Sequence, residues 1–207
     1  MLKDFIELYP FGKLSDRQKK AIEFIIHKME SSSIQQQRWQ AYTLATIRLE
    51  TANTYEPIQE GYYLTGNRKL KLYNYYKEHN PKALKTIFPD GYNGTNYLGR
   101  GLVQITHIYN YETFSKILSI DLVHNPDRAL EPEIAWCILE QGMTKGLFTG
   151  KKLSDYFNDD VSDFYNARKI INGLDRAIEI KESAEKIFFA ISGIHSKDIP
   201  EPRGIEK

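Results

Sequence analysis

Residues 38–51, RWQAYTLATIRLET, contain neither proline nor glycine and carry apolar side chains on most sides. Such a stretch predicts a central, largely buried helix. Glu50 lies near the C-terminal end of this helix, beside Ile47 and Leu49. Burial disfavours the charged form of a carboxyl group and raises its pKa. We therefore expect Glu50 to be a candidate proton donor.

The sequence on either side of this helix is also mainly helical. Ser15 and Gln18 have the spacing of a capping box and precede apolar residues at helical intervals. Residues 52–67 contain Pro57, Gly61 and Gly66, which predict an irregular or short hairpin segment. Further helices are expected at residues 68–79, 111–118, 132–143, 161–171 and 177–191.

The composition excludes several classes of function. The 207 residues include 28 Lys and Arg against 27 Asp and Glu, so the chain lacks the net charge that favours binding to nucleic acid or an anionic membrane. No apolar run is long enough for a membrane span or a signal peptide, which predicts cytoplasmic synthesis. The only cysteine, Cys137, cannot form a disulfide within the chain.

A second carboxylate follows Glu50 on the irregular segment. Glycoside hydrolysis requires one protonated carboxyl group at the leaving oxygen and a second, ionised carboxylate across the sugar. Glu56 and Glu60 are the nearby candidates, although the residue pattern taken alone favours solvated surface acids. His79 and His107 lack the spacing of metal ligands, and we expect neither a metal nor a cofactor.

Three blocks of sequence, in order, resemble glycoside hydrolase family 19, the chitinases and their endolysin branch in the lysozyme-like superfamily. Residues 49–62, LETANTYEPIQEGY, are similar to the family's segment that contains both catalytic acids. Residues 97–111, YLGRGLVQITHIYNY, are similar to its Gly-Arg-Gly and Gln-Ile-Thr block, and residues 167–177, ARKIINGLDRA, to its later Asn-Gly block. Leu49 departs from the family, which has a histidine before the first acid.

The resemblance assigns roles by position. Glu50 matches the general acid, and Glu60 matches the general base of an inverting mechanism. Thr106 matches the residue whose hydroxyl helps to hold the attacking water. Substrate-binding matches are Gln104, Asn110 and Asn172, and the amides of these side chains suit N-acetyl and hydroxyl groups.

Aromatic and arginine residues near the three blocks have more than one interpretation. Tyr62, Tyr63, Tyr109 and Tyr111 are candidates for stacking on sugar rings, with packing in the core as the alternative. Arg100, between two glycines, and Arg168 are expected to have structural roles, Arg100 by binding a carboxylate with its forked guanidinium and Arg168 in an ion pair.

The resemblance implies a mainly α, α+β fold in which a lysozyme-like helical domain and a small irregular or β lobe form a cleft. We expect one catalytic domain over residues 1–192 and a disordered tail over residues 193–207. The implied reaction is hydrolysis of β-1,4 bonds in bacterial peptidoglycan by a monomer, after release across the membrane through a hole-forming partner, a holin. Chitin hydrolysis and a catalytically weak carbohydrate-binding module are the alternatives. Residues 64–96 differ from plant chitinases and are expected to alter substrate choice.

Overall fold

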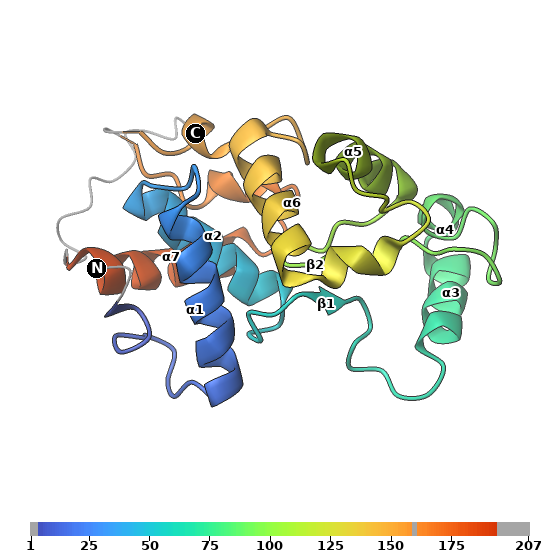
Figure 1. Cartoon of the computed structure of the whole chain (residues 1–207), viewed down its shortest axis with the longest axis horizontal. Helices are drawn as coiled ribbons and strands as arrows, with labels where there is room; N and C mark the ends of the chain where they lie inside the picture. Colours follow the sequence, from blue (N-terminus) through green and yellow to red (C-terminus); the bar gives the residue numbers. More distant parts are fainter. Residues whose placement is uncertain (1–3, 159–160, 194–207) are drawn as a thin grey trace. The chain divides into compact units, whose positions relative to one another are not determined.

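The computed structural model describes residues 4–158 and 161–193. Its helices are α1 (Asp16–Glu30), α2 (Gln37–Glu50), α3 (Arg68–His79), α4 (Pro81–Ile87), α5 (Ile108–Leu118), α6 (Pro132–Lys145) and α7 (Ala177–Ser192) (Figure 1). The remaining elements are strands β1 (Ile58–Gln59) and β2 (Arg100–Gly101) and the 3₁₀ helices η2 (Pro126–Leu130), η3 (Leu153–Asp155) and η4 (Asn166–Ile170). The predicted mainly helical fold with a small β element is confirmed.

The described chain forms two compact units. Unit 1 contains the described residues up to 55 and from 139 onward, and unit 2 contains residues 56–138. The single domain over residues 1–192 stays a prediction, and residues 194–207 of the predicted tail lie outside the described residues. Within the described residues, every helix is too short or too polar to cross a lipid bilayer.

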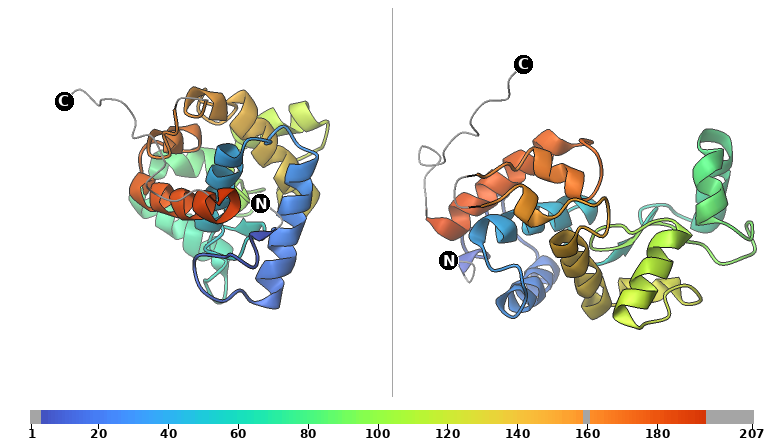
Figure 2. Two further views of the ribbon diagram at one scale, coloured as in Figure 1. Left: turned by 90° about the vertical axis from the view of Figure 1, so that its left-hand side faces the viewer. Right: turned by 90° about the horizontal axis from the view of Figure 1, so that it is seen from above.

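Unit 1 is built around α2, which packs against α7. Both views of Figure 2 show α7, in orange-red, beside the blue α2. The buried residues of α2 come from most sides of the helix, as its composition predicts, and its single tyrosine, Tyr42, is completely inaccessible. The helix α1 begins with the predicted capping box, since the side chains of Ser15 and Gln18 each bond the other's backbone N–H.

Unit 2 contains the two-stranded sheet and its own apolar cluster. β1 pairs antiparallel with β2, with Ile58 opposite Gly101 and Gln59 opposite Arg100. The buried residues of the apolar cluster are Leu72, Ile87, Phe88 and Leu98. They join α3 and α4 to the chain that leads into β2, and thereby support the strand that follows.

Arg100 has the structural role expected of it. Its side chain is 2% exposed, and Nε donates to Oδ1 of Asp127 over 2.8 Å. The other nitrogens donate to the carbonyl oxygens of Asn96 and Leu98, to Oδ1 of Asn96 and to the hydroxyl of Tyr111. The guanidinium therefore organises the loop before β2 and uses a single nitrogen, rather than a fork, on its carboxylate.

Arg100→Met is expected to lower the free energy of unfolding by at least about 2 kcal/mol, because buried carbonyl groups lose their donors. Urea denaturation followed by circular dichroism measures this change. Arg128→Met is the matched control, because Arg128 pairs with Glu131 at the surface, where such pairs contribute about 0–1 kcal/mol. Equal stability of the two variants would contradict the structural role of Arg100.

Two segments differ from the helices predicted from sequence. Residues 161–171 do not form a continuous helix, and only η4 is helical there. The Asp163 carboxylate accepts hydrogen bonds from the backbone N–H and the side-chain amide of Asn166, and local bonds of this kind compete with a helix. The prediction also omitted α4, which Asn80 caps by accepting from the Ala83 N–H and which Pro81 begins.

Candidate active site

Glu50 is the last residue of α2 and forms an ion pair in unit 1. Arg168 donates from a terminal guanidinium nitrogen to Oε1 of Glu50 over 2.6 Å. The side chains are 16% exposed for Glu50 and 4% for Arg168, so the pair is largely shielded from water. Nε of Arg168 donates to the carbonyl oxygen of Asp175, which holds the guanidinium from a second direction. Glu50 thus has a fixed orientation at the end of its helix.

The ion pair joins two residues that lie far apart in the sequence. Sequence reasoning expected an ion pair for Arg168 and did not identify Glu50 as its partner, because 118 residues separate the two.

Tyr42 connects α2 to the segment that contains Arg168. Its hydroxyl donates to the carbonyl oxygen of Ala167 over 2.7 Å. Burial raises the pKa of Tyr42, and the hydroxyl therefore remains a neutral donor at every physiological pH. Asn172 follows on the same segment, where its backbone N–H bonds the carbonyl oxygen of Arg168 and its side chain is exposed. Its exposed amide remains available for a ligand.

Glu60 follows β1 in unit 2, and both of its carboxylate oxygens accept hydrogen bonds. The Tyr76 hydroxyl donates to Oε1 over 2.7 Å, and the Gly99 N–H donates to Oε2 over 3.2 Å. Burial, followed by the charge and hydrogen bond of Glu60, raises the pKa of Tyr76. These two donors hold the Glu60 carboxylate in a fixed position, which suits a general base.

Gly99 brings Glu60 together with two more predicted residues. Its carbonyl oxygen accepts from the Glu60 N–H over 2.8 Å. A Cβ at position 99 would lie 3.0 Å from Oε1 of Gln104 and 3.2 Å from Oγ1 of Thr106. A Cβ atom rarely lies this close to another heavy atom, so the glycine at position 99 leaves room for both oxygens. Glu60, Gln104 and Thr106 thus form one cluster around Gly99.

Hydrogen bonds define the orientation of the polar groups in this cluster. Nε2 of Gln104 donates to the carbonyl oxygens of Ile58 and Gly101, and Nδ2 of Asn110 donates to the carbonyl oxygen of Thr106. The Thr106 hydroxyl donates to the carbonyl oxygen of Gln104 over 2.9 Å. Because that bond uses its only proton, the hydroxyl oxygen can serve a water molecule only as an acceptor.

The four tyrosines proposed for sugar stacking divide into two groups. Tyr62, Tyr63 and Tyr109 are exposed, and the Tyr109 ring stacks on His107 with 5.2 Å between centroids and 12° between planes. Tyr111 is completely buried and hydrogen-bonded to the carbonyl oxygen of Leu98. The stacking role considered for Tyr111 is wrong, because its ring belongs to the core. The exposed three remain candidates.

Sequence reasoning missed Tyr76 as part of this site. Tyr76 lies on α3, which was predicted as a surface helix rich in lysine and tyrosine, and nothing in that pattern distinguishes it from Tyr73 or Tyr75. Its role follows from the packing of α3 in unit 2. The described residues contain no group of three or more His, Cys, Asp or Glu side chains arranged to hold a metal ion.

Tyr76→Phe is expected to lower kcat about tenfold, because a hydrogen bond to a charged group contributes about 1.5–3 kcal/mol. KM should change little, because the Tyr76 hydroxyl positions Glu60 and does not have to contact the substrate. Initial rates measured over a range of substrate concentrations separate kcat from KM. Tyr75→Phe is the matched control. A kcat equal to that of the wild type would exclude a positioning role for Tyr76.

Comparison with solved structures shows a likeness of fold. No family profile matches the chain. The structure is similar to chitinase C from Streptomyces griseus HUT6037, with a TM-score of 0.53 and 17% identity over 93% of this chain and 76% of that one.

Two further solved structures are similar to the chain. A glutamate-to-glutamine mutant of chitinase C matches with a TM-score of 0.55 and 18% identity over 93% of this chain and 76% of that one. A bacterial family 19 chitinase matches with a TM-score of 0.45 and 16% identity over 90% of this chain and 94% of that one. At this level of identity the likeness to chitinase C shows the fold. It agrees with the fold that the three sequence blocks imply.

Proposed function

We propose that the chain is a glycoside hydrolase that cleaves β-1,4 bonds of bacterial peptidoglycan by inversion. The observation that carries this proposal is the cluster around Gly99, where the Glu60 carboxylate and the Thr106 hydroxyl, whose oxygen can still accept from water, both lie next to the same glycine. Together with the chitinase fold, this is the arrangement that a general base and its water require.

Glu60 acts on the water in this proposal. The hydrogen bonds from Tyr76 and Gly99 hold the carboxylate in place, and Glu60 removes a proton from the water as that water attacks the anomeric carbon. The lone pairs of Thr106 accept the other proton of the water in a hydrogen bond and thereby orient it. Gln104 and Asn110 then contact the sugar with the amide oxygens that their own hydrogen bonds leave free.

Glu50 donates its proton to the leaving oxygen. In this proposal the protonated form of Glu50 reacts. The hydrogen bond from Arg168 then stabilises the carboxylate that the proton transfer leaves behind. The proposal predicts that the carboxyl groups of Glu50 and Glu60 lie roughly 6.5–9.5 Å apart when substrate is bound, which leaves room for the water.

Mass spectrometry of digested peptidoglycan tests the reaction and the bond. Purified wild-type protein is expected to release muropeptides that have a new reducing end, and the identity of that end, muramic acid or glucosamine, names the bond that is cut. Digestion by Glu50→Gln serves as the blank. Absence of any new reducing end from wild-type digests would contradict the proposal.

Chitin hydrolysis is the second candidate function, and the matched solved structures favour it because they are chitinases. Chitin shares the N-acetylglucosamine backbone and lacks the lactyl and peptide substituents. Release of chitin oligomers with no change in peptidoglycan would select chitinase activity. Binding of either polymer without turnover by the wild type would instead indicate a carbohydrate-binding module.

A further inference from the structure

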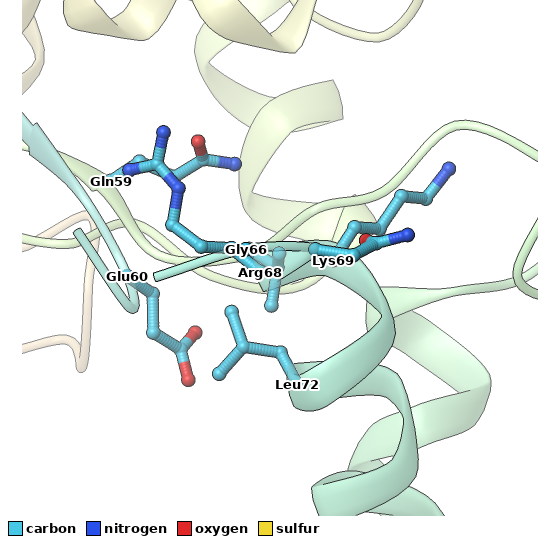
Figure 3. A pocket seen from close by; sticks show the side chains of 8 residues that line it. Gln59, Glu60, Gly66, Arg68, Lys69 and Leu72 are labelled. Atoms are coloured by element: carbon cyan, nitrogen blue, oxygen red, sulfur yellow. The ribbon is translucent and has the colours of Figure 1, made fainter. Parts of the chain in front are cut away.

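A pocket in unit 2 lies beside Glu60 at the start of α3. Its volume is about 270 Å³, and its lining includes Gln59, Glu60, Arg68, Lys69 and Leu72 (Figure 3). In Figure 3 the Glu60 carboxylate points toward Leu72, while Arg68 and Lys69 extend from the first turn of the helix. Ligand pockets usually measure about 300–1,000 Å³. This pocket therefore suits one substituent of a sugar rather than a length of polysaccharide.

The charges at the pocket favour an anion. Its two cations outnumber its one carboxylate, and both oxygens of that carboxylate already accept hydrogen bonds. Among the described residues, the exposed Arg68 guanidinium has no hydrogen bond or ion pair. Lys69 donates from Nζ to the carbonyl oxygen of Gly94 over 2.8 Å, which anchors the ammonium group and leaves two of its three protons for a ligand.

Arg68 and Lys69 lie at a position where positive charge destabilises α3. The N-terminus of a helix carries partial positive charge, so acids are favourable in the first turn and cations are unfavourable. The first turn of α3 has no acidic residue and contains Arg68 and Lys69. Proteins depart from this charge preference mainly where function requires it, so cations in the first turn beside a pocket indicate residues that are retained for binding.

We propose that Arg68 binds a carboxylate of the lactyl or lactyl-peptide substituent of muramic acid, the substituent that distinguishes peptidoglycan from chitin. This inference rests on the proposed function and names a residue that selects its substrate. A sugar ring contacts Glu60, and its acidic substituent extends to the start of α3. The guanidinium forms two parallel hydrogen bonds with the carboxylate, and Leu72 provides an apolar surface for the lactyl methyl group.

Arg68→Gln tests the inference on three soluble substrates. These are chitin oligomers, peptidoglycan strands stripped of peptides so that the lactyl carboxylates are free, and strands that retain their stem peptides. The variant is expected to lose about tenfold in kcat/KM on the acidic strands, as for the loss of one charge-assisted hydrogen bond, and less than about twofold on chitin oligomers. Selective loss on peptide-free strands identifies the lactyl carboxylate as the ligand. Selective loss on peptide-bearing strands identifies a stem-peptide carboxylate.

Lys71→Gln is the matched control, because Lys71 is exposed on the same helix and does not line the pocket. Lys71→Gln removes the same charge as Arg68→Gln. If both variants had the same effect, the loss would reflect general electrostatic attraction of the acidic glycan to the protein, and the inference would be overturned. Equal losses by Arg68→Gln on all three substrates, or none on any, would also overturn it. Thermal denaturation should show that Arg68→Gln is at least as stable as the wild type, since a cation leaves a helix N-terminus.

Binding measured by isothermal titration calorimetry separates this inference from the proposed function. If the wild type cuts none of the three substrates, the proposed function fails. The inference still predicts that the wild type binds peptide-free muramyl glycan about tenfold more tightly than a chitin oligomer of equal length, and that Arg68→Gln removes most of this preference. Equal binding of the two glycans by the wild type would overturn the inference. If the wild type hydrolyses peptidoglycan while Arg68→Gln shows no selective loss, the inference alone fails.

Discussion

Glu50→Gln is expected to lower the rate of glycan hydrolysis by about a hundredfold or more, because glutamine cannot donate the proton that the leaving oxygen requires. The glutamine side chain has nearly the same shape, and its carbonyl oxygen can still accept the hydrogen bond from Arg168. The fold should therefore survive. Reducing-end release at saturating substrate measures the rate, and thermal denaturation checks the fold.

A matched control separates the chemistry from the loss of an ion pair. Glu179 forms a two-bond ion pair with Arg176 at the surface of unit 1, at 2.7 and 2.9 Å. Glu179→Gln weakens an arginine–carboxylate pair as Glu50→Gln does, and its activity should remain within about twofold of the wild type, as for most surface changes. Near-normal turnover by Glu50→Gln would remove Glu50 from the role of general acid.

Glu60→Gln is expected to cause a loss of similar size, about a hundredfold, because the water loses its proton acceptor. Tyr76 and Gly99 donate to different oxygens of Glu60, so the glutamine carbonyl oxygen keeps one of these two hydrogen bonds while the basic charge is lost. The same reducing-end assay measures the effect. Substrate affinity should change much less than kcat, since the lost interaction is made in the transition state.

Glu56→Gln identifies which acid of the irregular segment carries the chemistry. Glu56 lies four residues before Glu60, and the residue pattern alone did not distinguish the two. The structure surrounds Glu60 with Gly99, Gln104 and Thr106, so we expect Glu56→Gln to retain most of the activity. If Glu56→Gln were inactive and Glu60→Gln active, the second carboxylate would be misassigned.

Helices with strong local signals could be predicted from the sequence. The apolar run of α2 and the capping box of α1 are properties of neighbouring residues, and both are present in the structure. The helix predicted over residues 161–171 is wrong because the Asp163 carboxylate accepts a hydrogen bond from the Asn166 N–H, and such local bonds compete with a helix. The signal for α4 was present in Asn80 and Pro81, which form a helix start.

Three of the predicted site residues lie together in the structure, whereas the hydrogen-bond partners of the candidate site could not be predicted from the sequence. The resemblance named Glu60, Gln104 and Thr106, and unit 2 brings these three together around Gly99. Pairs that join distant parts of the chain could not be read from local sequence, and the ion pair of Glu50 with Arg168 is the main example. A side chain's neighbour across 118 residues is set by packing, which no local pattern encodes.

The anomeric form of the first product tests the central claim most directly. Proton NMR can follow the anomeric signals during hydrolysis of a soluble β-1,4 glycan, before mutarotation mixes the two forms. A general base that activates water on the face opposite the leaving group predicts that the α-anomer appears first. Initial release of the β-anomer would mean retention, and it would contradict the assignment of Glu60 as the base that acts through water.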